Sequence, residues 1–132
     1  PTTLVGQKAA TAPKGRDPVG QGMGYPIRVI EMLATLEGTR YLARGAVNSA
    51  ANVLKLKRYI RKAFEAQMSG IGVTMVEVLS PCPTNWGMDP AEAVAWLESD
   101  MIAQFPLGEI KDELAGSRAA VEERTAMEVR ND

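Results

Sequence analysis

The stretch IGVTMVEVLS, residues 71–80, decides how this chain folds. Its apolar residues do not simply alternate with polar ones, because they occupy both faces of an extended segment. They are Val73, Met75, Val76, Val78 and Leu79. A strand that is apolar on both faces is typical of the centre of a parallel sheet that helices cover on each side. The pattern therefore predicts a buried, central, parallel strand.

The sequence before this strand predicts a βαβ unit. The segment ANVLKLKRYIRKAFEAQM, residues 51–68, has the apolar spacing of a long helix. Asn48 or Ser49 can cap its start, and Gly70 ends it. Its inward face is predicted to hold Val53, Leu56, Ile60, Ala63 and Phe64. TRYLARGAV, residues 39–47, is a shorter strand candidate, and the crossover between the two strands should be right-handed.

The flanking segments divide into an arm, two shorter helices and a tail. Residues 1–24 are rich in glycine and proline without periodicity, and are predicted to be an extended arm or loop. A helix is expected after Pro26, in IRVIEMLATLEG. A second helix should start at Asp89, with Pro90 and Glu92 completing a capping box, and run to about Met101. QFPLGEIKD, residues 104–112, is expected to be irregular, and residues 113–132 form a tail that can be helical.

Two parallel strands with three helices make an incomplete sheet. Parallel pairs normally lie inside larger doubly wound sheets, and a two-stranded sheet leaves two edges exposed. The predicted fold class is therefore α/β, with a βαβ unit and flanking helices in residues 25–112 that form the C-terminal half of a parallel-sheet domain.

Composition narrows the classes of function. At 132 residues the chain fits one domain, and a net charge of −1 gives no overall bias toward nucleic acid or membranes. Histidine is absent, which removes the commonest general base and the usual Ser-His and Cys-His pairs. One cysteine allows no internal disulfide, and neither an apolar run of membrane-spanning length nor a signal peptide is found. These features predict a cytoplasmic protein.

Cys82 lies in SPCPTNWGM, residues 80–88, directly after the predicted central strand. One interpretation is a small buried apolar side chain, as free cysteines often are. The other is functional, because ligands in open α/β sheets gather at the carboxyl ends of strands, and Pro81 and Pro83 would stiffen the loop. A single cysteine cannot hold a metal, so that role needs ligands from outside these 132 residues.

Five cations fall within eight residues of the long predicted helix. They are Lys55, Lys57, Arg58, Arg61 and Lys62. The simpler interpretation is the solvated outer face of an amphipathic helix. The alternative is a surface that attracts an acidic protein partner, such as an electron carrier.

Three stretches carry a resemblance to a known family: PTTLVGQKAATAPKGRDP, GYPIRVIEMLATLEGTRYLAR, and VEVLSPCPTNWGMDPAEAVAWLESDMIAQFPLGEIKD. Together they resemble the C-terminal part of the beta, thiamine-diphosphate-binding subunit of the 2-oxoacid:ferredoxin oxidoreductases, and within that family the 2-oxoglutarate type. The resemblance implies part of the thiamine-diphosphate-binding fold. It also implies oxidative decarboxylation of a 2-oxoacid with coenzyme A, giving acyl-CoA and electrons for ferredoxin.

The resemblance also implies roles for particular residues. Cys82 would be the fourth ligand of a [4Fe–4S] cluster whose other three cysteines lie outside this chain, and Asn85 and Trp86 would lie close to that cluster. Thr2 and Thr3 would border the site of thiamine diphosphate and its Mg²⁺. The implied partners are an alpha subunit, ferredoxin, the 2-oxoacid and coenzyme A, within a homo- or hetero-oligomer.

The family's GDG-type and TGGQ motifs are absent from this sequence. The chain is therefore expected to be a fragment that by itself is inactive, holds no cluster and binds thiamine diphosphate weakly. The rival hypothesis is a non-catalytic α/β module that oligomerises or completes a partner subunit through its exposed sheet edge.

Overall fold

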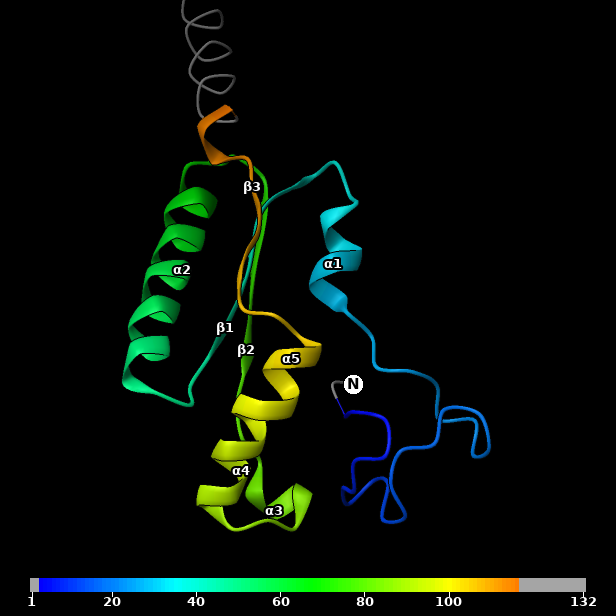
Figure 1. Ribbon diagram of the computed structural model, residues 1–132. Coiled ribbons are helices and arrows are strands. Elements are labelled where there is room, and N and C mark those ends of the chain that lie inside the picture. Colours follow the sequence, from blue (N-terminus) through cyan, green and yellow to red (C-terminus); the bar gives the residue numbers. More distant parts are fainter. Residues whose placement is uncertain (1–2, 117–132) are drawn as a thin grey trace, which may run out of the picture.

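A small open α/β sheet forms the centre of the computed structural model, which describes residues 3–116. Its three strands are β1 (Thr39–Ala46), β2 (Val73–Leu79) and β3 (Gly108–Asp112), in the order β2-β1-β3. β1 runs parallel to β2 and antiparallel to β3, so the sheet is mixed. Figure 1 shows the helix α2 (Ala50–Met68) beside the sheet, as the predicted βαβ unit requires.

The central strand is β1, and the prediction that residues 71–80 form the central strand is wrong. Seven of the eight β1 residues are buried, whereas the edge strand β2 exposes 57% of Val73 and 42% of Val78. Gly45 suits the centre of the sheet because a Cβ there would lie 2.8 Å from Cδ1 of Leu56 on α2. The apolar pattern of β2 shows which faces can be covered, but not whether a strand lies beyond it.

α2 covers one face of the sheet and begins where the sequence predicts. The backbone N–H of Asn52 donates to Oγ of Ser49, so Ser49 is the N-cap. Leu56, Ala63 and Ala66 are its buried residues. Ile60 and Phe64, which were predicted to face inward, are 37% and 66% exposed because they lie beside the outer edge of β2, which no strand within residues 3–116 covers.

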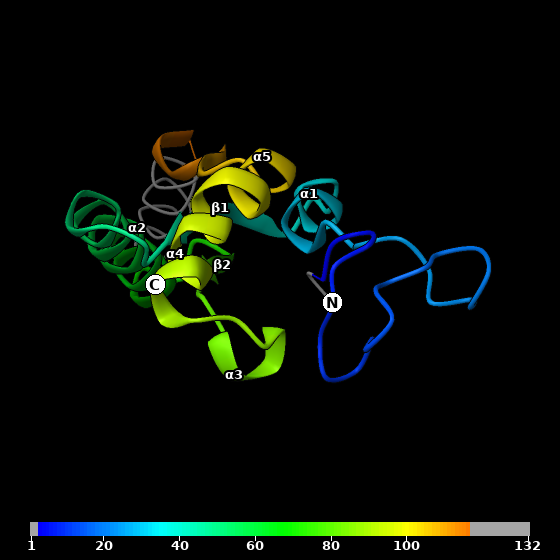
Figure 2. The same ribbon diagram turned by 60° about the horizontal axis from the view of Figure 1, so that its bottom comes forward.

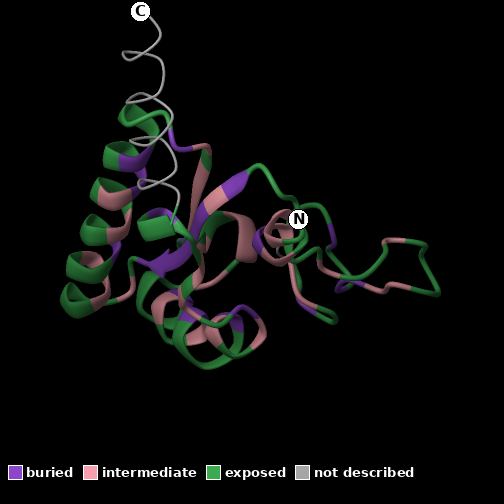
Figure 3. Ribbon diagram, turned by 90° about the horizontal axis from the view of Figure 1, so that it is seen from above, coloured by how far each residue is buried: buried purple, intermediate pink, exposed green. Residues whose placement is uncertain are grey.

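On the side of the sheet away from α2, α1 (Val29–Ala34) contacts β1 and β3, and consecutive helical segments pack on Ala46 and Leu79, the last residues of β1 and β2 (Figure 2). They are α4 (Pro90–Trp96), the π-helical turn η1 (Leu97–Met101) and α5 (Ile102–Gln104). The predicted capping box is confirmed, since Asp89 accepts from the Ala91 N–H and Glu92 accepts from the Asp89 N–H. The predicted inward residues Ala93, Leu97 and Met101 are all buried. Buried residues concentrate along the sheet and on the helix surfaces that face it (Figure 3).

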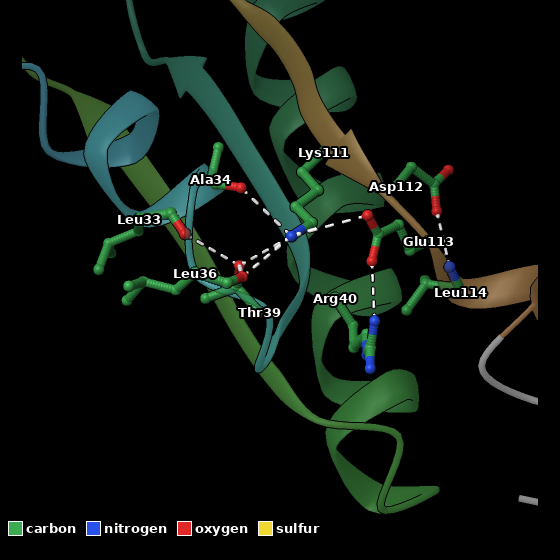
Figure 4. A network of polar contacts seen from close by, with 9 residues as sticks. All are labelled: Leu33, Ala34, Leu36, Thr39, Arg40, Lys111, Asp112, Glu113 and Leu114. Atoms are coloured by element: carbon green, nitrogen blue, oxygen red, sulfur yellow. Dashed lines mark hydrogen bonds and ion pairs between the residues drawn. The ribbon is translucent and has the colours of Figure 1, made fainter.

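β3 corrects the expectation of an irregular segment at residues 104–112. Residues 108–112 show only a weak apolar pattern, but they form a strand because β1 supplies hydrogen-bond partners for their backbone. Lys111 on β3 also binds the end of α1 (Val29–Ala34), as Figure 4 shows. Its ammonium donates to the carbonyls of Ala34 and Leu36 at 3.2 and 3.0 Å, which satisfies carbonyls at a helix C-terminus.

The arm is irregular, as predicted, but it is held by specific contacts. Arg16, only 9% exposed, donates to the carbonyls of Met23 and Gly24, both at 2.9 Å. α1 follows the arm and begins at Val29, three residues after Pro26. Within residues 3–116 no helix is long and apolar enough to cross a membrane. Thr2 and most of the predicted tail, residues 117–132, lie outside the described residues.

Candidate functional site

A pocket of about 240 Å³ lies at the carboxyl end of β2. We name it the Cys82 pocket. Its polar lining residues are Thr3, Gln7, Glu77, Ser80, Cys82 and Asn85, and its wall also includes Trp86. Four of the five residues predicted to be functional, namely Thr3, Cys82, Asn85 and Trp86, therefore border one hollow. The fifth, Thr2, lies outside the described residues.

The sulfur-bearing side chain of Cys82 is exposed, so the interpretation as a buried apolar residue is wrong. Cys82 is the N-cap of the short helix α3 (Pro83–Trp86), and its carbonyl accepts from the Trp86 N–H at 3.0 Å. Gly87 ends the helix with φ of 64°, in the left-handed region that glycine tolerates best. The loop therefore presents the thiol at the surface from a regular turn.

Two tryptophans hold this turn against the helices behind it. The rings of Trp86 and Trp96 are 5.0 Å apart at an interplanar angle of 61°, an edge-to-face arrangement that aromatic pairs favour. Both pack on the buried cluster of Ala46, Leu79, Leu97, Met101 and Phe105. This packing anchors Trp86 in addition to its place in the pocket wall.

The arm contributes Thr3 and Gln7 to the lining of the pocket. The N–H of Ala10 donates to the Asn85 carbonyl at 2.8 Å, which ties the arm to α3. Gln7 is buried there, and its Oε1 accepts from the Leu4 N–H at 2.8 Å. Sequence reasoning missed Gln7, because nothing in an irregular, glycine-rich segment indicates which side chain will be enclosed.

Behind the pocket wall lies a buried charge cluster that the sequence did not single out. Arg44 on β1 is fully buried and donates to Glu31 on α1, with two bonds of 2.8 and 2.7 Å. Its Nε donates to Oε2 of Glu77 at 2.5 Å, and its guanidinium lies 5.4 Å from the centre of the Phe105 ring. The hydrogen bonds from Arg44 hold the pKa of Glu31 below its usual value. Glu77 thus brings a fixed, paired carboxylate to the pocket.

The cofactors implied by the resemblance can be tested against these residues. A [4Fe–4S] cluster is normally held by four cysteine thiolates, and the sequence contains one. In residues 3–116 no group of three or more His, Cys, Asp or Glu side chains could hold a metal ion. Among the described residues, Glu77 is the only carboxylate that lines the Cys82 pocket, and it is paired with Arg44. Residues 3–116 by themselves therefore do not supply the ligands of a complete cluster or of a magnesium diphosphate site.

Of the five cations within residues 55–62 of α2, one is held in ion pairs and four are exposed. Lys62 donates to Glu109 at 2.6 Å and to Asp112 at 2.5 Å, and so joins α2 to β3. Partial burial acts to lower the pKa of Lys62, but its hydrogen bonds to these two carboxylates outweigh that effect and raise the pKa above its ordinary value. The other four, Lys55, Lys57, Arg58 and Arg61, are exposed, as a solvated helix face predicts.

Comparisons with known proteins give two relatives, both named ketoisovalerate oxidoreductase subunit VorA. The relative from Methanothermobacter marburgensis is 38% identical over 112 residues, which are 85% of this chain and 23% of that protein. The relative from Methanothermobacter thermautotrophicus is also 38% identical, over 87% of this chain and 24% of that protein. No family model and no solved structure matches the chain.

The chain spans about a quarter of the length of these relatives, so the similarity concerns one segment of a longer subunit. The alignment covers most of this chain, in which the sheet and the Cys82 pocket both lie. The chain is therefore related to a segment of the ketoisovalerate oxidoreductase subunits.

Proposed function

We propose that this chain is part of the beta, thiamine-diphosphate-binding subunit of a 2-oxoacid:ferredoxin oxidoreductase. Similarity to the VorA subunits supports oxidoreductase chemistry on a 2-oxoacid, since ketoisovalerate is one. The resemblance of the sequence favours 2-oxoglutarate as the substrate. Ketoisovalerate is the alternative substrate, because the relatives are named for it. The observation that carries the proposal is the Cys82 pocket, in which an exposed thiol is grouped with Thr3, Asn85 and Trp86.

Within this proposal Cys82 supplies one thiolate to a [4Fe–4S] cluster, and the other three come from outside this chain. An exposed sulfur on a turn fixed by α3 and by the Trp86–Trp96 pair suits a ligand, because its direction is set before the metal arrives. The cluster would pass electrons from a thiamine-diphosphate-bound substrate to ferredoxin, and coenzyme A and an alpha subunit complete the proposed assembly. The proposed location is the cytoplasm.

The test uses the gene product that contains this chain, purified without oxygen together with the subunits that bind it. We expect about four irons per Cys82-dependent cluster, as the cluster type requires, and a low-temperature electron paramagnetic resonance signal after reduction. Cys82→Ser should remove or alter that signal and lower 2-oxoacid-dependent ferredoxin reduction. Thr84→Ala, on the exposed face of the same short helix, is the matched control. A complete, unaltered cluster in Cys82→Ser would refute the ligand assignment.

Activity with 2-oxoglutarate and with ketoisovalerate, measured side by side, tests the substrate. A higher kcat/KM for 2-oxoglutarate supports the type that the sequence resembles. A higher value for ketoisovalerate assigns this chain the substrate named for its relatives.

A second candidate function rests on the groove between α2 and β2. Ile60, Phe64 and Val78 line this groove and are exposed, beside the uncovered edge of a parallel strand. A non-catalytic module that completes a partner sheet would use this edge, as peptides do when they add a strand. Sedimentation of the 132-residue chain tests this: concentration-dependent association that Phe64→Lys abolishes supports it, and a stable monomer contradicts it.

A further inference from the structure

The outer face of α2 points away from the sheet and combines positive charge with apolar side chains. It is defined by six exposed residues at helical spacing: Leu54, Lys57, Arg58, Arg61, Glu65 and Met68. They lie opposite Leu56, Ala63 and Ala66, the residues that α2 buries. Figure 3 shows that the side of α2 away from the sheet is exposed along the helix. This face is therefore open to a partner.

The three cations of this face have no ionic partner within residues 3–116. Lys62 on the same helix is held by carboxylates of β3, but no ion pair of the described residues includes Lys57, Arg58 or Arg61. Glu65 is the only carboxylate of α2, whereas the whole chain has a net charge of −1. Positive charge is thus concentrated on this helix, and its attraction for carboxylates is not used within the described part of the chain.

Two large apolar side chains lie on the same face. Leu54 is 58% exposed and Met68 is 87% exposed. Leu54, Arg61 and Met68 are spaced seven residues apart, so they follow one line along the helix that is about 21 Å long at 1.5 Å per residue. Contact with water alone does not favour such side chains, whereas protein interfaces combine apolar contacts with a polar rim and are enriched in methionine and arginine.

The combination of charge and apolar surface selects the kind of partner. An apolar protein layer would bury three cations without compensation, which is unfavourable, so the partner has to supply carboxylates. A helix that binds a membrane surface inserts its apolar face, but the apolar face of α2 is already packed on β1 and β2. An acidic protein surface that also carries apolar side chains meets both requirements.

We propose that the outer face of α2 docks an acidic protein, whose carboxylates pair with Lys57, Arg58 and Arg61 and whose apolar side chains contact Leu54 and Met68. We identify this partner with an acidic ferredoxin, the electron acceptor in the proposed function, and for that identity the inference rests on the proposed function. The geometry agrees with this identity. Because β1 and β2 are parallel and α2 follows β1, α2 begins at the end of the sheet where the Cys82 pocket lies (Figure 1).

The test measures binding of the 132-residue chain to an acidic bacterial ferredoxin by isothermal titration calorimetry. We expect saturable binding that weakens at least about tenfold between low salt and about 0.15 M salt, where charges are screened over about 8 Å. Lys57→Glu combined with Arg61→Glu should weaken binding at low salt at least about tenfold and reduce its dependence on salt. The matched control, Lys8→Glu combined with Lys14→Glu, changes the net charge equally at exposed positions of the arm and should change the affinity less than about twofold.

Lys57→Gln combined with Arg61→Gln replaces the charge-reversal variant if circular dichroism shows that the latter does not fold. Leu54→Ser should weaken binding without changing its dependence on salt, because it removes an apolar contact and no charge. Equal affinity of the folded double variant and the parent would overturn the proposal. So would equally strong binding of the basic protein cytochrome c, or preferential binding to vesicles that contain phosphatidylserine.

The two proposals fail in different ways, because this binding requires no cofactor on the chain. A folded chain that does not bind ferredoxin refutes the docking face and leaves the Cys82 assignment in place. An unaltered cluster in Cys82→Ser refutes that assignment, and salt-dependent binding that is lost on charge reversal would still support the docking face.

Discussion

Arg44 Nε donates to Glu77 Oε2 at 2.5 Å, and this bond connects the most buried strand of the protein to the wall of the Cys82 pocket. The same guanidinium holds Glu31 on α1 and the carbonyl of Pro106 at 3.2 Å. The Arg44 side chain thus joins the central strand β1 to the edge strand β2, to α1 and to the turn before β3. Because it is fully buried, its charge is compensated only by these partners.

Replacing Arg44 should therefore destabilise the whole chain. Arg44→Ala leaves the Glu31 and Glu77 carboxylates without their cation, and removal of one member of a buried ion pair typically costs about 3–5 kcal/mol. Urea unfolding of the 132-residue chain measures the loss. Arg58→Ala, on the exposed face of α2, should change the free energy of unfolding by less than about 0.5 kcal/mol. Equal stability of the two variants would contradict the structural role of Arg44.

The Glu31–Arg44 pair also predicts how stability depends on pH. The pKa of Glu31 is lowered in the folded chain from an ordinary value of 4.5, chiefly by its hydrogen bonds from Arg44. The resulting stabilisation is fully present above pH 4.5 and is lost as the pH falls through the lower, folded-state pKa. Unfolding free energies measured from pH 7 to pH 3 should fall less steeply in Glu31→Gln than in the parent chain. Parallel profiles would show that Glu31 does not contribute to this dependence.

Gly45 and Leu56 should behave as a coupled pair. A Cβ at Gly45 would lie 2.8 Å from Cδ1 and 3.1 Å from Cβ of Leu56, so Gly45→Ala forces α2 away from the sheet. Overpacking of this kind typically costs about 1–3 kcal/mol. In the Gly45→Ala background, Leu56→Ala should cost less than in the parent, because the smaller side chain relieves the clash. Additive losses in a double-mutant cycle would contradict this packing.

The Trp86–Trp96 contact should stabilise the Cys82 turn beyond the effect of burial alone. Edge-to-face aromatic pairs contribute about 0.5–1.5 kcal/mol in double-mutant cycles. Replacing each tryptophan by leucine, singly and together, should give a coupling energy in that range by thermal unfolding. The single variants should also increase the rate of Cys82 alkylation, because the turn that carries the thiol loses its anchor. Zero coupling would show that the two rings pack independently.

Local chemistry in the sequence determined several elements of this protein. The apolar period of α2, its Ser49 cap and the Asp89–Glu92 capping box depend on residues within a few positions of one another, so they can be read without a tertiary fold. The position of Cys82 after a strand was predictable for the same reason. The identification of Thr3, Asn85 and Trp86 came from a family resemblance, and they prove to border the same pocket.

Only the tertiary structure decided the strand order, the strand at residues 108–112 and the environments of Arg44 and Gln7. Strand order depends on which backbone edges meet, and the apolar pattern of β2 is the same whether it is central or at an edge. β3 exists because β1 offers it hydrogen-bond partners, and the exposure of Ile60 and Phe64 follows from what lies beyond β2. Burial of a polar side chain is set by contacts distant in sequence, and no local pattern of residues encodes those contacts.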